Sequence, residues 1–160
     1  MKLLIFGAGG FIGSNLAEHL IEQGEHEVVG LDVTDAKLAG IEGPNFKFIK
    51  GNISDADLAN ELVADCDVVV DLIAYANPSI YVEKPLDVVQ LNFFENMKIL
   101  EYCLAHQKRL IQYSTSEIYG KRTRDERYND DHSDLVMGPV QKQRWIYASS
   151  KQLLERIIYA

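Results

Sequence analysis

The chain has 160 residues, close to the usual size of one domain, and its 47% hydrophobic and 25% charged residues exclude a disordered or fibrous protein. A net charge of −8 argues against binding to nucleic acid or to an anionic membrane. Residues 1–80 hold 13 acidic and four basic residues, whereas residues 81–160 hold 11 and 12, so we expect side chains that bind an anion in the second half. No apolar run approaches the roughly 18 residues of a membrane span, and the start is too short for a signal peptide. We therefore expect a single soluble domain, residues 1–160, in the cytoplasm.

Apolar runs and helical periodicities alternate along the chain. Strands are predicted at residues 3–6, 28–31, 46–49, 67–74 and 110–113. Helices are predicted at 11–23, at 54–63 with Ser54 as the cap, from Pro85 to 104, and at 145–159. The helix from Pro85 has an apolar stripe of Leu86, Val89, Phe93, Met97, Leu100 and Leu104. A polar stretch from 121 to 133 is expected to be a loop.

Strands that alternate with helices predict right-handed β-α-β units and a parallel sheet covered on both faces. The expected fold is α/β, a doubly wound, Rossmann-like sheet of strand order 3-2-1-4-5. In such a sheet the ligand crevice lies at the switch between the first and fourth strands. Cys66 and Cys103 lie in apolar segments without metal-ligand spacing, which predicts two buried thiols and no metal site.

A glycine motif separates the first strand from the first helix. Gly7, Gly10 and Gly13 have the spacing that lets a main chain approach a pyrophosphate, and the helix that starts at Phe11 and Ile12 points its N-terminus at it. A plain turn is the alternative. Asp32 ends the second strand where an acid can hold ribose hydroxyls, which favours a dinucleotide. Because an acid repels a 2′-phosphate, NAD is expected over NADP.

A second group of candidate residues follows the fifth strand and lies on the last helix. Tyr147 and Lys151 are four residues apart and share a helix face, where an ammonium and a cationic nicotinamide can stabilise a phenolate. A chance pair on a solvated face is the alternative. Thr115, Ser116 and Glu117 come directly after the fifth strand, where ligands of this fold bind. A polar strand exit with a solvated Glu117 is the alternative.

These motifs together resemble the extended short-chain dehydrogenase/reductase family, the NAD-dependent epimerases and dehydratases of nucleotide sugars. Further segments are similar to the branch that oxidises and decarboxylates UDP-glucuronate in the lipid A aminoarabinose (polymyxin resistance) pathway. They are Ser-Thr-Ser-Glu-Ile-Tyr-Gly at 114–120, Asp-His-Ser-Asp-Leu at 131–135, Gly-Pro-Val at 138–140 and Arg-Trp-Ile-Tyr-x-x-Ser-Lys-Gln-Leu-Leu at 144–154. Thr-Ser-Glu, in place of the Thr-Asp-Glu of the dehydratases or the small residues of the epimerases, implies decarboxylation.

The resemblance implies a role for each matching residue. Thr115 and Tyr147 would contact the sugar 4-hydroxyl, with Tyr147 as base and Lys151 tuning it while holding the nicotinamide ribose. Glu117 and Ser116 would assist the loss of CO2 from the 4-keto sugar. Arg144 would pair with the anionic substrate, although a loop arginine in water is the alternative. Ala76 and Tyr81 would line the sugar site, although Tyr81 could equally serve in packing.

Two departures from the family pattern affect the interpretation. Asn52 and Ile53 occupy positions where the family usually has Asp-Ile, with the Asp on the adenine amino group. The Asn52 carbonyl oxygen can still accept that hydrogen bond, so adenine binding should weaken but persist. The chain also stops where the family continues with further strands and a substrate domain, so we expect a cofactor half, truncated before those parts. The alternatives to a UDP-glucuronate decarboxylase are a non-catalytic NAD-binding module and a nucleotide-sugar 4-epimerase or 4,6-dehydratase. The family's dimers imply a homodimer through the helices near 85–104 and 145–159.

Overall fold

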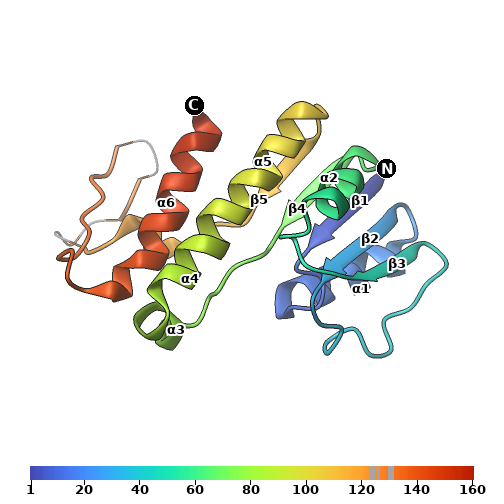
Figure 1. Ribbon diagram of the computed structural model, residues 1–160, viewed down its shortest axis with the longest axis horizontal. Coiled ribbons are helices and arrows are strands. Elements are labelled where there is room, and N and C mark those ends of the chain that lie inside the picture. The colour runs from blue at the N-terminus through green and yellow to red at the C-terminus, as the bar shows by residue number, and fades with distance from the viewer. Residues whose placement is uncertain (123–124, 126, 130–131) are drawn as a thin grey trace. The chain divides into compact units, whose positions relative to one another are not determined.

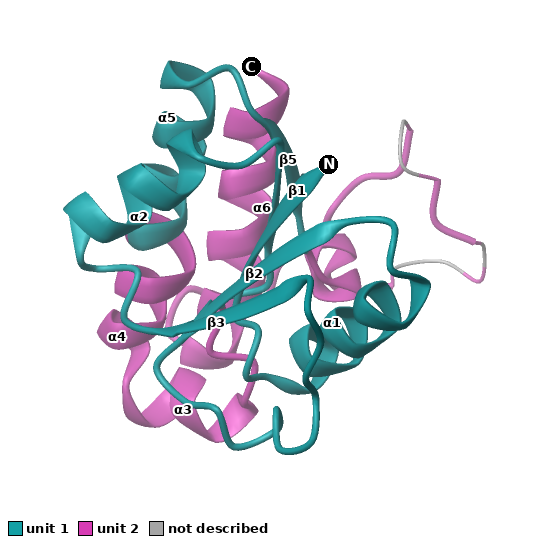
Figure 2. Cartoon of the chain, turned by 90° about the vertical axis from the view of Figure 1, so that its right-hand side faces the viewer, with its two compact units in different colours: residues 1–73, 95–113 teal, residues 74–94, 114–160 magenta. Residues whose placement is uncertain are grey.

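The computed structural model describes residues 1–122, 125, 127–129 and 132–160. Its elements fall into two compact units, residues 1–73 with 95–113 and residues 74–94 with 114–160 (Figures 1 and 2). The loop predicted at 121–133, and Asp131 of the Asp-His-Ser-Asp-Leu segment, lie partly outside the described residues.

The first unit contains the whole sheet. Its strands are β1 (Lys2–Phe6), β2 (Glu27–Asp32), β3 (Phe46–Lys50), β4 (Val68–Asp71) and β5 (Arg109–Gln112). All pair in parallel in the order β3-β2-β1-β4-β5, as the sequence predicts. Helix α1 (Phe11–Gln23) lies on one face, and α2 (Ala56–Ala64) and α5 (Asn96–Ala105) lie on the other (Figure 2). The predicted doubly wound Rossmann-like fold is confirmed.

The core of this unit forms where β1 and β4 run between the two helical layers. Ile5, Val28 and Val70 are almost fully buried and pack with Ala8 and Ala17. Strands buried on both faces consist of unbroken apolar runs. The predicted bounds of β1 and β2 therefore lie close to the observed ones. Helix α1 ends at Gly24, whose φ of 67° supplies the left-handed cap expected there.

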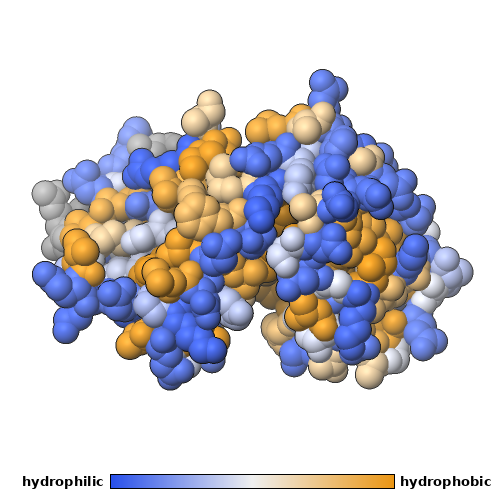
Figure 3. Space-filling model, viewed as in Figure 1, coloured by the Kyte–Doolittle hydropathy of each residue, from blue (hydrophilic) through white to orange (hydrophobic). Residues whose placement is uncertain are grey.

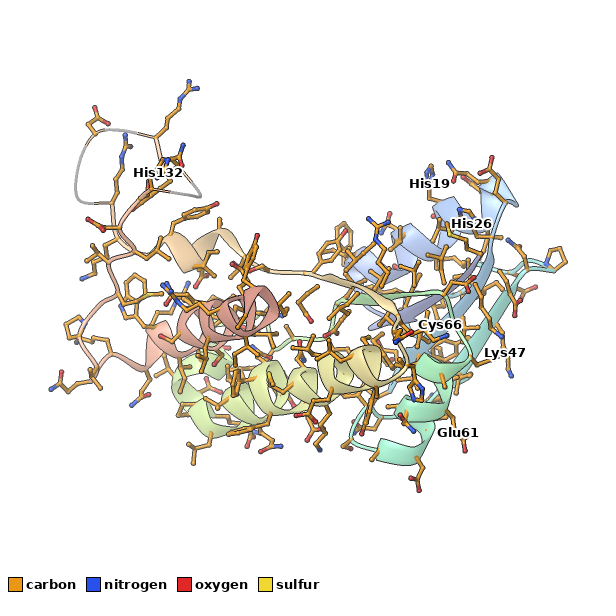
Figure 4. The ribbon with its side chains drawn as sticks, turned by 90° about the horizontal axis from the view of Figure 1, so that it is seen from above. His19, His26, Lys47, Glu61, Cys66 and His132 are labelled. Atoms are coloured by element: carbon orange, nitrogen blue, oxygen red, sulfur yellow. The ribbon has the colours of Figure 1, made fainter. Side chains whose placement is uncertain are left out.

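Cys66 and Cys103 are free thiols and each is 2% exposed, so the prediction of two buried thiols is confirmed. Burial raises the pKa of Cys66 to about 11 and the pKa of Cys103 to about 12. Figure 4 shows Cys66 in this unit, with Glu61 of the neighbouring α2 extending outward. In the described part of the chain no group of three His, Cys, Asp or Glu side chains is placed to hold a metal ion.

Two elements differ from the predictions at their boundaries. The cap of α2 is Asp55, whose carboxylate accepts a hydrogen bond from Leu58 N at 3.2 Å, so the prediction of Ser54 as the cap is wrong. Strand β4 ends at Asp71, four residues long rather than the predicted eight. The Asp71 side chain accepts the Ile73 N–H at 3.0 Å, which turns the main chain out of the sheet ladder.

The second unit contains short helices and one long one. They are α3 (Pro78–Glu83), α4 (Pro85–Val89), the 3-10 turns η2 (Ser116–Tyr119) and η3 (Gln143–Trp145), and α6 (Ile146–Tyr159). Helix α3 is not predicted from the sequence, because six residues are too few to show a helical period. Helix α6 is confirmed. No helix in the described residues has the length and apolar character to cross a membrane.

The helix predicted from Pro85 is interrupted by a π-helical turn, η1 (Gln90–Glu95), between α4 and α5. The buried face nevertheless lies one position before the predicted apolar stripe both ahead of this turn and after it, because the polar side chains of Asn92, Glu95 and Asn96 occupy that face. Leu86 and Leu104 are 79% and 69% exposed. The buried positions are Val88, Asn92, Glu95, Asn96, Ile99, Leu100 and Cys103.

Candidate functional site

The glycine loop of the first unit is shaped by main-chain contacts. Gly7 has a φ of 86° and donates its N–H to Leu31 O at 2.9 Å, which brings the loop over the end of β2. A Cβ added at Gly13 would overlap the carbonyl oxygen of Gly7 and lie 2.7 Å from the Cα of Ala8. The α1 helix can therefore approach β1 this closely only with glycine at that position, as a pyrophosphate-binding turn requires.

The N-terminus of α1 is open to an anion. Gly10 is the N-cap, no side chain caps the helix, and the first turn has no acidic residue. Phe11 and Ile12 of that turn are 73% and 49% exposed. The first N–H groups of a 13-residue helix thus keep their positive dipole end unneutralised, which suits a phosphate.

Asp32 is tied to the same loop. Its Oδ2 accepts a hydrogen bond from Gly9 N at 3.0 Å, and its Oδ1 accepts one from Thr34 N at 3.1 Å. A Cβ at Gly9 would overlap the carbonyl oxygen of Thr34, so this close approach also depends on glycine. The acid predicted to bind a ribose therefore lies beside the glycine loop and is hydrogen-bonded to it. The residues present fit a dinucleotide, and Gly9 is a member of the loop that the three-glycine motif did not include.

Asn52 and Ile53 follow β3 in the same unit. The Oδ1 of Asn52 accepts a hydrogen bond from Ser54 N at 3.0 Å, so the amide is oriented by its own turn. Its carbonyl oxygen has a second lone pair with which to accept from an adenine amino group. Ile53 is only 4% exposed, which leaves little of it for a ligand to contact.

The pair Tyr147 and Lys151 lies on α6 in the second unit. Tyr147 is 7% exposed and Lys151 is 2% exposed. The face that carries this pair is therefore buried, and the solvated face of the alternative interpretation is wrong. A buried lysine on the same face as a buried tyrosine is a combination that a purely structural helix seldom needs.

Thr115 connects the loop after β5 to Tyr147. Its Oγ1 accepts a hydrogen bond from Glu117 N at 3.2 Å, and its side chain also hydrogen-bonds with the Tyr147 side chain. Burial raises the pKa of Tyr147, the charge of Glu117 adds to the rise, and the hydrogen bond with Thr115 opposes it. The surroundings of Tyr147 thus shift its pKa upward, away from the lowered value that a base needs.

Glu117 and Arg144 form a bidentate ion pair. Arg144 Nη1 donates to Oε2 of Glu117 at 2.6 Å, and Nη2 donates to Oε1 at 2.8 Å. The side chains are 31% exposed for Glu117 and 44% exposed for Arg144. Neither residue is simply solvated, as the alternative interpretations would have it. The sequence predicts both residues in the site but does not indicate that they bind each other.

The ion pair borders a cavity of about 310 Å³ lined by Glu117, Gly120, Arg144 and Trp145. Trp145 packs directly on Gly138, where any Cβ would overlap its indole, and the Lys121 ammonium lies 5.8 Å from the ring centroid. Trp145 was not among the predicted site residues. The sequence feature that indicates Trp145 as a site residue is its position next to Arg144.

The remaining predicted substrate residues differ in exposure. Ala76 and Ser116 are exposed, Ser116 at the start of η2. Tyr81 is 2% exposed and its ring stacks on that of Tyr147, with centroids 4.7 Å apart and planes at 7°. The second unit therefore brings together Tyr81, Thr115, Glu117, Arg144 and Tyr147.

Residues 3–160 match the model of the NAD dependent epimerase/dehydratase family. Among solved structures, the PbgP3 protein from Burkholderia pseudomallei is similar at 39% identity and a TM-score of 0.92, over 99% of this chain and 48% of that one. UDP-glucuronic acid 4-epimerase from Bacillus cereus is similar at 27% identity and a TM-score of 0.82, over 99% of this chain and 51% of that one.

A dTDP-glucose 4,6-dehydratase from Bacillus anthracis, solved in complex with NAD, shares the fold at 23% identity and a TM-score of 0.79, over 98% of this chain and 49% of that one. The chain thus spans about half the length of these solved structures.

Proposed function

The chain belongs to the NAD dependent epimerase/dehydratase family, and from this premise we propose that it provides the cofactor-binding and base-bearing half of a UDP-glucuronate decarboxylase. The proposed reaction oxidises C4 of UDP-glucuronate and then removes the C6 carboxylate as CO2, which leaves a UDP-4-keto-pentose. The observation that carries the proposal is the Glu117–Arg144 pair beside Tyr147, because a uronate needs both a cation for its carboxylate and an acid–base group near C5.

The proposal assigns the cofactor to residues whose geometry suits it. The N–H groups at the start of α1 would hold the pyrophosphate, with Gly7, Gly10 and Gly13 allowing its approach. Asp32 would hold the adenosine ribose and disfavour a 2′-phosphate, so NAD is preferred over NADP. When bound, NAD⁺ accepts the hydride from C4 of the sugar and brings positive charge to the site.

Tyr147 would act on the sugar 4-hydroxyl. The phenolate oxygen removes the hydroxyl proton while the hydride leaves C4, and Thr115 steadies the phenolate through the hydrogen bond that it already makes. Lys151, buried one turn further along α6, would supply the ammonium that stabilises the phenolate.

The second step uses the ketone formed in the first. With a carbonyl at C4, the C6 carboxylate becomes a β-keto acid, and the electron pair of the C5–C6 bond moves toward the C4 oxygen as CO2 leaves. C5 then takes up a proton, and Glu117 is the proposed donor after its carboxylate has left Arg144 and taken up a proton from water, with Ser116 beside it. Because Arg144 holds Glu117 in two hydrogen bonds, a substrate carboxylate that binds Arg144 would displace Glu117 and release it for this role.

A 4-epimerase of UDP-glucuronate is the second candidate, favoured by the 27% identity with the Bacillus cereus protein of that description. Such an enzyme would use the same cofactor and the same Tyr147, but it would keep C6. A chain that binds NAD without turnover remains the third possibility. Mass analysis of the product separates these functions, since only the decarboxylase shortens the sugar.

The deciding experiment replaces Glu117 by Gln in the full-length protein. Gln keeps the size and can still accept a hydrogen bond, but it cannot transfer a proton. We expect CO2 release from UDP-glucuronate to fall by about 10²- to 10⁴-fold, while the rise in absorbance from the reduced cofactor persists in a single turnover. Unchanged CO2 release would refute the assignment. Loss of both signals would place Glu117 in substrate binding instead.

The proposal retains a homodimer and a cytoplasmic location. Apolar side chains remain at the surface of the helices that the family resemblance assigns to the interface: Leu86 on α4, Phe94 in η1, Leu104 on α5, and Leu153 and Ile158 on α6. Figure 3 shows apolar residues among the charged ones on one face of the molecule. Covering such residues with a second copy would remove apolar surface from water.

A further inference from the structure

Tyr81 contacts two of the groups that the proposed function uses. We propose that Tyr81 is a positioning residue, which holds Tyr147 and Arg144 in their working orientations and does not itself bind the sugar. The inference rests on the proposed function and assigns to Tyr81 a role different from the substrate contact that the family resemblance implies.

The first contact is with the base. The Tyr81 and Tyr147 rings are nearly parallel, at 7°, with centroids 4.7 Å apart. Both are buried, and they pack with Val88, Ala74 and Ile146 in one apolar cluster. The Tyr147 side chain is thereby held on its ring face as well as through its hydrogen bond with Thr115.

The second contact is with the cation. The Cζ atom of Arg144 lies 5.1 Å from the centroid of the Tyr81 ring, within the range of a cation–π interaction. A guanidinium that rests on a fixed ring has few orientations available, and the one observed lets both of its terminal nitrogens meet Glu117. Tyr81 thus supports Glu117 through Arg144.

Tyr81 is itself firmly held. Helix α3, which carries it, begins with Pro78, and its Asn77 cap accepts the N–H of Ser79 at 3.1 Å. Just before it, the amide of Asn92 accepts from Tyr75 N at 2.8 Å and donates to Tyr75 O at 3.1 Å. A six-residue helix is thus anchored at its start by side-chain bonds, which is what a positioning role requires.

Exposure argues against direct contact with a substrate. Tyr81 is 2% exposed, while Ala76, just before helix α3, and Arg144 are open to solvent. A sugar nucleotide can therefore reach Arg144 without touching the Tyr81 ring.

The test compares Tyr81→Phe with Tyr81→Leu in the full-length protein. Phe keeps the stacked ring and the cation–π contact, so we expect kcat and the pH midpoint of kcat to stay within twofold and within about 0.3 units of wild type. Leu removes both contacts, so we expect kcat to fall by about 10²-fold. The midpoint should move to lower pH, because the phenol of Tyr147 becomes more accessible to water. If Tyr81→Leu does not fold, Tyr81→Met offers a longer, flexible apolar side chain without a ring.

Tyr128→Leu is the matched control, because it breaks another stacked tyrosine pair of the same unit, Tyr119 with Tyr128 at 5.2 Å. It should leave kcat and its pH profile unchanged. A raised KM for the sugar nucleotide in Tyr81→Phe would show that the hydroxyl contacts the substrate and would overturn the inference. Wild-type kinetics in Tyr81→Leu would also overturn it.

A second readout does not depend on turnover. In Tyr81→Leu the Arg144 Nε–H signal in nitrogen-15 spectra should shift and exchange faster with water, and in Tyr81→Phe it should stay as in wild type. If wild-type protein converts no nucleotide sugar, the proposed function fails, while this signal still decides whether Tyr81 holds Arg144. An unchanged signal in Tyr81→Leu would refute the positioning role.

Discussion

The glycine loop of the first unit and the Thr115–Glu117 loop of the second are built by opposite means. In the glycine loop the main chain does the positioning: Gly7 bonds to the end of β2, and Gly13 admits the helix because it has no side chain. In the second loop the side chains do it, through an ion pair between residues 27 positions apart and a stack between Tyr81 and Tyr147.

The difference teaches how each site should respond to substitution. A site shaped by main-chain approach is damaged when atoms are added, because there is no room for them. A site shaped by side-chain contacts is damaged when atoms are removed, because its groups then lose their partners. The predictions below test this contrast from the largest expected effect to the smallest.

Removal of one oxygen from Tyr147 should have the largest effect. Tyr147→Phe keeps the stack on Tyr81 and the apolar packing, so stability should change by less than about 1 kcal/mol. The group that removes the proton is gone, and kcat should fall by about 10³-fold. Steady-state kinetics and calorimetric titration with NAD⁺ check both parts, with NAD⁺ affinity expected to stay as in wild type. Full activity in this variant would remove Tyr147 from the mechanism.

Adding one carbon at Gly13 should disable the first unit's site. The new methyl group of Gly13→Ala meets the Gly7 carbonyl and Ala8, so α1 has to move away from β1. We expect a loss of about 1–3 kcal/mol in the free energy of unfolding and at least a tenfold loss of NAD⁺ affinity by calorimetry. Gly10→Ala is the graded control, because its Cβ would meet only Gly7 O, at 3.2 Å. Equal effects at the two positions would contradict the steric argument.

The same contrast explains what the sequence could predict. The strand order follows from the alternation of apolar runs and helical periods, and α1 with its glycine cap follows from a pattern a few residues long; both predictions are confirmed. Asp32 was predicted to bind a ligand, but its bond to Gly9 depends on how the chain folds back on itself. The Glu117–Arg144 pair and the Tyr81 stack join distant segments, and no local pattern encodes such a pairing.

The errors in the helices have a similar origin. The stripe from Leu86 to Leu104 was placed by its apolar side chains, whereas a row that includes the polar Asn92 and Asn96 faces the interior. A π turn has no periodic signature that distinguishes it in advance. A pattern of apolar residues also cannot indicate that the amides of Asn92 and Asn96 are buried.

Shortening the cation at Arg144 should cause a loss of intermediate size. Arg144→Lys keeps the charge but offers a single ammonium, which can neither meet both oxygens of Glu117 nor lie flat over Tyr81. We expect KM for UDP-glucuronate to rise about tenfold, with a smaller change for UDP-glucose, which has no carboxylate. Binding assays with both sugar nucleotides measure the difference. An equal loss for the two ligands would show that Arg144 does not recognise the carboxylate. Arg156→Lys, at the end of α6, is the control.

The smallest expected effect is a loss of folding stability at alkaline pH, which should begin at a different pH for the buried groups of each unit. The pKa values of Cys66 and Cys103 rise on burial from 9.0 to about 11 and about 12, and that of Tyr81 from 10.0 to about 12. A group whose pKa is raised by folding contributes its full stability below its unfolded value and loses it as the pH rises through the folded value. The stability that the protonated thiols of the first unit contribute should therefore begin to be lost near pH 9. The contribution of Tyr81 in the second unit should begin to be lost only near pH 10. Urea unfolding at pH 8, 9.5 and 10.5 measures this slope. Cys103→Ala should flatten it from pH 9 upward, and Tyr81→Phe only above pH 10, so a slope that neither variant changes would mean that other groups control it.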